Sequence, residues 1–164
     1  MLKGILLITI TLACAAAGRL FSNVRKKRSE ALTQILGGMR VLRIRVLNSA
    51  EPVSVLMRKS DLPMFYNLGQ KIGEGMTAAE GWDSLKAGAA GELECLTAAD
   101  IAVLDDFFAG LGRSGRDEQD SLFSMSVARL EEALSQAKSR YQESSKTFAA
   151  LGALVGIAIC IMIV

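Results

Sequence analysis

Two uncharged apolar runs lie at the ends of the chain, over residues 5–17 and 148–164. A helix needs about 20 mostly apolar residues to cross the hydrocarbon of a bilayer. Extending the runs to residues 1–23 and 147–164 brings each close to that length. We therefore predict two transmembrane helices, with one domain over residues 24–146 between them.

Basic side chains lie on the inner flank of each apolar run. The first run is followed, and the second preceded, by a group of cations: Arg25, Lys26, Lys27 and Arg28, then Lys138, Arg140 and Lys146. Positive charge close to a span is retained on the cytoplasmic side of the membrane. The pattern predicts a cytoplasmic central domain, with both termini on the opposite side.

The first apolar run has two alternative interpretations. Small residues at 15–17 are suited to a signal peptidase, and cleavage there would leave a secreted or membrane-anchored helical regulatory protein. A lipoprotein site at Cys14 fits less well, because Thr11 stands where such sites carry Leu. The basic cluster that follows opposes translocation, which favours an uncleaved span.

The central segment has a helical pattern of apolar positions. From residue 32 to residue 47 these positions recur every three or four residues, as on one face of an amphipathic helix. Further helices are predicted over 52–59, over 62–72 with Asp61 as N-cap, and over 78–87. A fifth ends at Gly110, and a sixth begins near Asp117. The sixth has an apolar stripe formed by Leu122, Met125, Leu130, Leu134, Ala137 and Tyr141. Thr77 with Glu80, and Thr97 with Asp100, have the spacing of a capping box.

These elements predict an all-α fold, an antiparallel bundle of about six helices. Its N-terminal and C-terminal helices continue into the membrane spans. Five apolar residues from separate helices are expected to share one core: Trp82, Leu104, Phe107, Leu130 and Leu134.

The charge of the chain is unevenly distributed. Residues 1–60 contain 11 Lys/Arg and 2 Asp/Glu, whereas residues 61–164 contain 8 and 15. The two halves could pair within the molecule or form separate docking faces, although membrane topology and anionic lipid explain the basic half more simply. Asp105 and Asp106 are expected to be exposed, as solvated surface or as a docking patch for a basic partner.

The chain offers little for catalysis, and we predict no catalytic, cofactor-binding or metal-binding residue. It has no histidine, which removes the commonest general base and metal ligand. Residues 110–115 match G-x-G-x-x-G, but a dinucleotide site needs a preceding strand, so an interhelix turn is expected. Nucleic-acid binding by Arg40, Arg43 and Arg45 is disfavoured, because no aromatic residue lies among them. Gly152 and Gly156 form a GxxxG that allows close approach of a second helix, either by self-association or by packing against the first predicted span.

Several segments together resemble the stage III sporulation protein AB family over essentially the full length. The similar segments are the apolar start with its basic stretch, residues 79–85 around Trp82, and residues 104–115 followed by Gln119. Leu111 and Gly112 match the family pattern, whereas Gly115 stands where an Asp is usual. None of these motifs is catalytic.

The resemblance implies a non-enzymatic protein of the mother-cell membrane that surrounds the forespore. It also implies a six-helix domain similar to the cytoplasmic domains of type II secretion platform proteins. Its expected partners are a cytoplasmic secretion-type ATPase and the other membrane proteins of a sporulation channel.

Overall fold

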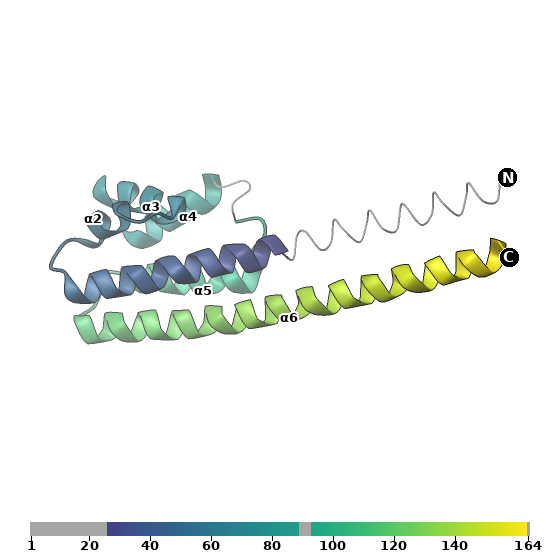
Figure 1. Cartoon of the computed structure of the whole chain (residues 1–164). Coiled ribbons are helices and arrows are strands. Elements are labelled where there is room, and N and C mark those ends of the chain that lie inside the picture. The colour runs from purple at the N-terminus through teal and green to yellow at the C-terminus, as the bar shows by residue number, and fades with distance from the viewer. Residues whose placement is uncertain (1–25, 89–92, 164) are drawn as a thin grey trace. The chain divides into compact units, whose positions relative to one another are not determined.

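A computed structural model describes residues 26–88 and 93–163, with side chains described up to residue 140 and at residue 142. Every regular element in these ranges is a helix, which confirms the prediction of an all-α fold (Figure 1). The helices are 26–48, α2 (Val53–Arg58), α3 (Pro63–Gly73), α4 (Ala78–Gly88), α5 (Ala98–Gly110) and α6 (Arg116–Ile163).

The chain divides into two compact units. One is Glu30–Ser135, which holds the bundle, and the other consists of Met1–Ser29 with Gln136–Val164. The first predicted span, residues 1–23, lies outside the described residues, as do the side chains of the second, residues 147–164. In the part of the chain that the structure does describe, no helix is both long and apolar enough to cross a membrane. The domain boundaries at residues 23/24 and 146/147 stay predictions.

Local sequence signals place the starts of α4 and α5. Thr97 and Asp100 form a complete capping box at α5, as predicted. At α4, the Glu80 carboxylate accepts from the Thr77 backbone N–H, and the Glu80 N–H donates to the Thr77 hydroxyl, which confirms the second box.

The predicted N-cap of α3 is wrong by one residue. The N-cap is Leu62 rather than Asp61, and Leu62 makes no side-chain capping bond. Pro63 explains the difference, because it forces the residue before it into extended conformation and itself suits the first helical position.

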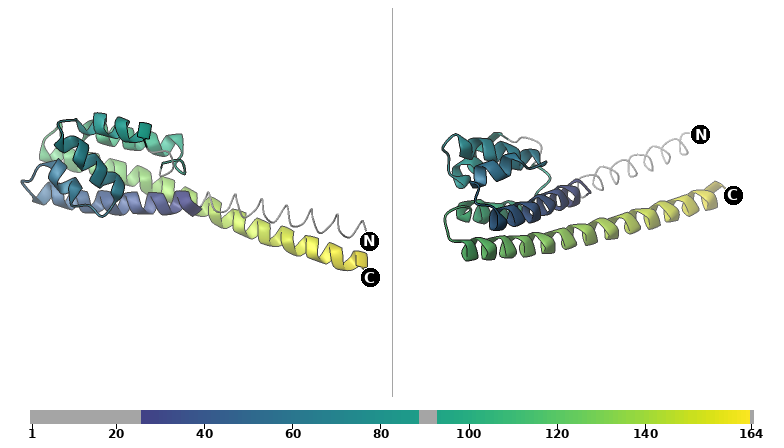
Figure 2. Two further views of the ribbon diagram at one scale, coloured as in Figure 1. Left: turned by 90° about the horizontal axis from the view of Figure 1, so that it is seen from above. Right: turned by 60° about the vertical axis from the view of Figure 1, so that its left-hand side comes forward.

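Within the bundle, α2, α3 and α4 lie together on one side of the helix 26–48, and the first part of α6 lies on the other (Figures 1 and 2). The helix 26–48 is antiparallel to α6. Arg40 pairs with Glu131, whereas Arg43, further along its helix, pairs with the earlier residue Asp120.

Aromatic side chains fill the centre of the bundle. Phe108 packs against Trp82, with ring centroids 4.8 Å apart, and against Phe107 at 5.0 Å. Phe107 continues the cluster to Phe123 of α6 at 5.0 Å, and Phe65 of α3 meets Phe108 edge-on at 6.3 Å. Rings from four helices therefore share one core.

Four of the five residues expected in that core are buried: Trp82, Leu104, Phe107 and Leu130. Leu134 is only partly buried.

The predicted apolar stripe of α6 is confirmed in part. Leu130 and Ala137 are buried, and Leu122 and Leu134 are partly buried. Met125 was expected on the same face, but 57% of it is exposed, and the buried Phe123 was not among the predicted positions. Tyr141 lies outside the described side chains.

Candidate functional site

The Gly-rich segment 110–115 is the turn between α5 and α6, as predicted. Gln119 in the first turns of α6 is 5% exposed and organises it. Its side-chain amide donates to the Gly110 carbonyl at 3.0 Å and to the Ser114 hydroxyl at 2.8 Å. Its side-chain oxygen accepts from the Gly112 N–H at 3.2 Å. Gly112 has φ +77°, which favours glycine.

This geometry lacks the elements of a dinucleotide site. A helix precedes the turn, whereas the phosphate-binding loop follows a strand. The N–H of Gly112, which a phosphate loop would present to its ligand, bonds instead to Gln119. The glycines therefore serve the connection between two helices.

The sequence predicts that Asp105 and Asp106 are both exposed, but Asp105 is partly buried. Its carboxylate accepts a hydrogen bond from the Trp82 indole N–H at 2.5 Å and pairs with the Lys86 ammonium at 2.6 Å. Trp82 and Lys86 belong to α4, so this carboxylate joins α4 to α5. Asp105 therefore belongs to the framework of the bundle, and sequence spacing gave no sign of its partners.

Charge complementarity shapes the pKa values of this cluster. Partial burial alone would raise the pKa of Asp105, but hydrogen bonds from Lys86 and Trp82, with the Lys86 charge, bring it below its ordinary value. Hydrogen bonds to Asp105, and then to Asp83, raise the pKa of Lys86. Both groups are therefore charged at neutral pH, as an ion pair requires.

Asp106 lies on the surface, as predicted. Its side chain is 71% exposed and lies 3.2 Å from Arg129 of α6, which is 55% exposed. An ion pair this open to solvent contributes about 0–1 kcal/mol to stability. Of the two predicted docking carboxylates, Asp106 is the more accessible to a partner.

The arginines of the helix 26–48 are engaged within the bundle. Arg40 pairs with Glu131 at 2.5 Å, and Arg43 pairs with Asp120 at 2.7 Å. Basic and acidic halves of the chain thus meet between this helix and α6. For Arg40, Arg43, Asp120 and Glu131, the charge asymmetry is therefore explained by pairing within the molecule.

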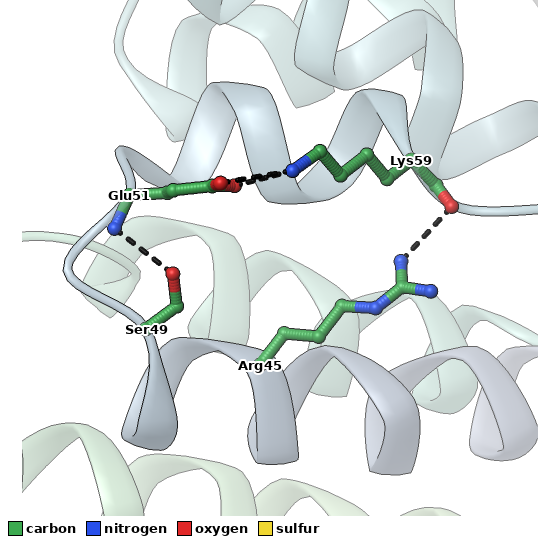
Figure 3. Close-up of polar contacts among 4 residues, drawn as sticks. All are labelled: Arg45, Ser49, Glu51 and Lys59. Carbon is green, nitrogen blue, oxygen red and sulfur yellow. Dashed lines mark hydrogen bonds and ion pairs between the residues drawn. The ribbon is translucent and has the colours of Figure 1, made fainter.

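Arg45 links the helix 26–48 to the end of α2 (Figure 3). Its guanidinium donates to the Lys59 backbone carbonyl at 2.9 Å, at the end of α2. The Lys59 ammonium lies 2.7 Å from the Glu51 carboxylate, and the Glu51 N–H donates to the Ser49 hydroxyl. All three arginines considered for nucleic-acid binding therefore have structural roles.

The remaining predicted residues fall at the edge of the described chain or beyond it. Arg25 lies outside the described residues, Lys26 and Lys27 are exposed, and Arg28 is partly buried. Gly152 and Gly156 lie on the α6 backbone, in a stretch whose packing lies outside the described part. Among the residues that were described, no group of three His, Cys, Asp or Glu could hold a metal ion.

Comparisons with known proteins give a consistent result. No curated protein matches the chain. A solved structure of Stage III sporulation protein AB matches with a TM-score of 0.58 at 18% identity, covering 71% of this chain and 97% of that one. This likeness supports the helical fold. The family model for Stage III sporulation protein AB matches residues 3–164. The chain therefore belongs to the stage III sporulation protein AB family.

Proposed function

We propose that the chain is a non-enzymatic platform subunit of a secretion-like sporulation complex. It lies in the mother-cell membrane around the forespore, with the bundle in the cytoplasm. There the bundle docks a secretion-type ATPase and contacts other membrane proteins of the channel. Family membership supports the role in sporulation.

The observation that carries the proposal is the continuity of α6. It runs as one helix from Arg116 to Ile163, from the bundle into the C-terminal apolar run. A partner bound to the bundle would thereby be joined by unbroken helix to the C-terminal apolar run, which in this proposal enters the membrane. A flexible linker, which would uncouple the two, does not interrupt this helix.

The polar groups of the bundle support a scaffolding role over a catalytic one. Asp105, Gln119 and the three arginines at 40, 43 and 45 hold helices or turns together. Thr77, Glu80, Thr97 and Asp100 cap helices. The hydrogen bonds and ion pairs of these side chains thus serve to hold the bundle together.

Asp106 is the residue of the predicted docking pair that we assign to the partner surface. Its exposed carboxylate on α5 would attract a basic face of the ATPase and steer its approach. Asp105 supports that surface from within by fixing α5 to α4.

Binding to a secretion-type ATPase of the same organism is the direct test. The full chain, held in lipid nanodiscs, is immobilised, and the purified ATPase is passed over it. We expect saturable binding, and its absence at the highest soluble ATPase concentration would refute the docking role. An intact N-terminus in the membrane fraction would in turn exclude the cleaved, secreted alternative.

A matched pair of charge reversals then tests the surface. Asp106→Lys should slow association at low salt and have less effect at moderate salt, because salt screens exposed charges. Asp61→Lys makes the same charge change at an exposed carboxylate before α3 and should leave association unchanged. Equal effects of the two variants would remove Asp106 from the docking surface.

A further inference from the structure

One face of the helix 26–48 is open to solvent. Its positions recur every three or four residues and lie opposite the buried face that holds Ile35, Met39 and Leu42. The residues of this face are all exposed, and we name them the outer seam: Gln34, Gly37, Val41, Ile44 and Asn48. The helix 26–48 lies along one edge of the bundle, which leaves the outer seam accessible (Figure 2).

The middle of the outer seam is apolar. Val41 is 47% exposed and Ile44 is 62% exposed, although proteins usually bury large apolar residues of this kind. The two side chains are three residues apart, so they are neighbours on the helix surface. One turn before Val41, a Cβ on Gly37 would meet nothing within 4 Å beyond its own helix. A second helix can therefore approach this face closely and cover both side chains.

Arginines on the two sides of the outer seam point away from it. Arg40 pairs with Glu131 of α6, on one side of the helix 26–48. Arg45 donates to the Lys59 carbonyl at the end of α2, on the other side. These side chains are held by neighbouring helices and mark the edges of the open face. The outer seam between them contains no charged residue.

The outer seam is complementary to itself. Gln34 and Asn48 have side-chain amides, which carry both donors and an acceptor, so each can bond to the same amide of a second copy. Val41 and Ile44 would pack on the same two residues of that copy. The nearest charge in this spacing is Glu30, one turn before Gln34, and salt screens the repulsion between exposed carboxylates.

The size of the outer seam indicates how its partner must be held. Two half-exposed apolar side chains offer far less than the roughly 800 Å² per partner that a stable complex in solution buries. A partner anchored in the same membrane has a high effective concentration, at which a small contact is sufficient. A second copy of this chain meets that condition and carries the same uncharged face.

We propose that the outer seam is a contact between two copies of this chain in the membrane, with their helices 26–48 parallel. The inference rests on the membrane anchoring in the proposed function. In each copy the helix 26–48 follows the first apolar run, residues 5–17, so insertion of that run would orient both helices alike. The contact is separate from Gly152 and Gly156, which lie in the C-terminal apolar run.

Disulfide cross-linking tests the contact in the full chain. The three native cysteines are replaced with alanine, one new cysteine is introduced, and the protein is reconstituted into liposomes and oxidised. A disulfide needs Cα atoms about 4.4–6.8 Å apart. Val41→Cys and Ile44→Cys should therefore link two copies. Three control variants place the cysteine at exposed large apolar residues outside the outer seam and should not link: Tyr66→Cys, Met76→Cys and Met125→Cys.

Fluorescence energy transfer between labelled copies in liposomes measures the strength of the contact. Val41→Ala with Ile44→Ala should weaken association by at least about tenfold, because four apolar side chains leave the pair. The matched control, Tyr66→Ala with Met125→Ala, removes exposed apolar side chains elsewhere and should leave association unchanged. Association should also persist from low to moderate salt, because the contact is apolar. Circular dichroism and Trp82 emission check that both variants are folded.

Several results would overturn the inference. Equal cross-linking at the control positions would indicate random collision, and no cross-linking at Val41 and Ile44 would exclude the contact. Association that survives the double alanine variant but is lost in Gly152→Leu with Gly156→Leu would place the contact in the C-terminal apolar run. Failure to enter liposomes would refute the membrane anchoring as well, whereas ATPase binding by a chain that does not pair would leave the proposed function standing.

Discussion

Gly69 of α3 lies where α2 crosses it, and replacing it with alanine tests how tightly the two helices pack. A Cβ at this position would lie 2.8 Å from the Arg58 backbone nitrogen and 2.9 Å from both the Ser54 carbonyl oxygen and the Met57 Cβ. These atoms belong to the backbone of α2 or are fixed to it. No rotamer change can therefore relieve the contact, and α2 would have to move away from α3.

The expected loss of stability follows from two opposing effects. Overpacking a tight contact costs about 1–3 kcal/mol, and rigid neighbours place this site near the upper end. Alanine recovers up to about 1 kcal/mol of helix propensity relative to glycine. The net loss for Gly69→Ala is therefore about 2 kcal/mol, which lowers the melting temperature of a domain this size by about 10 °C.

Gly37→Ala is the matched control. Gly37 lies in the helix 26–48 and is exposed, and a Cβ there would meet nothing within 4 Å beyond the backbone of its own helix, so only the propensity gain remains. The full chain is melted in detergent while circular dichroism and Trp82 fluorescence are followed. Trp82 is the only tryptophan and is 1% exposed, so its emission reports on the core. A Gly69→Ala protein as stable as Gly37→Ala would refute the close packing of α2 on α3.

Other contacts in the bundle lead to three more predictions. The pKa of Asp105 is lowered in the folded protein, so its contribution to stability is present above about pH 4 and is lost as pH falls through the folded pKa. Asp105→Asn should therefore flatten that part of the curve of melting temperature against pH. An unchanged curve would contradict the pairing of Asp105 with Lys86. Gln119→Leu removes the hydrogen bonds of Gln119 to the Gly112 N–H and the Gly110 carbonyl, which keeps only a 3.4 Å bond from the Arg113 N–H. The variant should cost about 1–2 kcal/mol in urea unfolding, and a loss near zero would show that the turn does not depend on Gln119. Leu130→Ala should cost about 2–5 kcal/mol, since Leu130 is fully buried, and Leu134→Ala should cost clearly less, so equal losses would place both residues in the same core.

The sequence by itself determined the features that depend on near neighbours. Thr97 and Asp100 are three residues apart, so helix geometry alone brings the hydroxyl and carboxylate to the first turn of α5. The same holds for the turn at 110–115, where glycines end one helix before the next begins. The helical class, and membership in the family, could be predicted because both rest on patterns of order and spacing along the chain.

Tertiary structure decided the contacts between residues distant in sequence. Arg40 and Glu131 are separated by 91 positions, and Trp82 and Asp105 by 23. An acidic residue at the edge of an apolar stripe has the same local pattern whether it faces water or an indole on another helix, so Asp105 was misplaced. One position of the predicted apolar stripe of α6 was misplaced for a related reason. Phe123 rather than Met125 is buried because the position of the facing helices fixes which seam of α6 they cover.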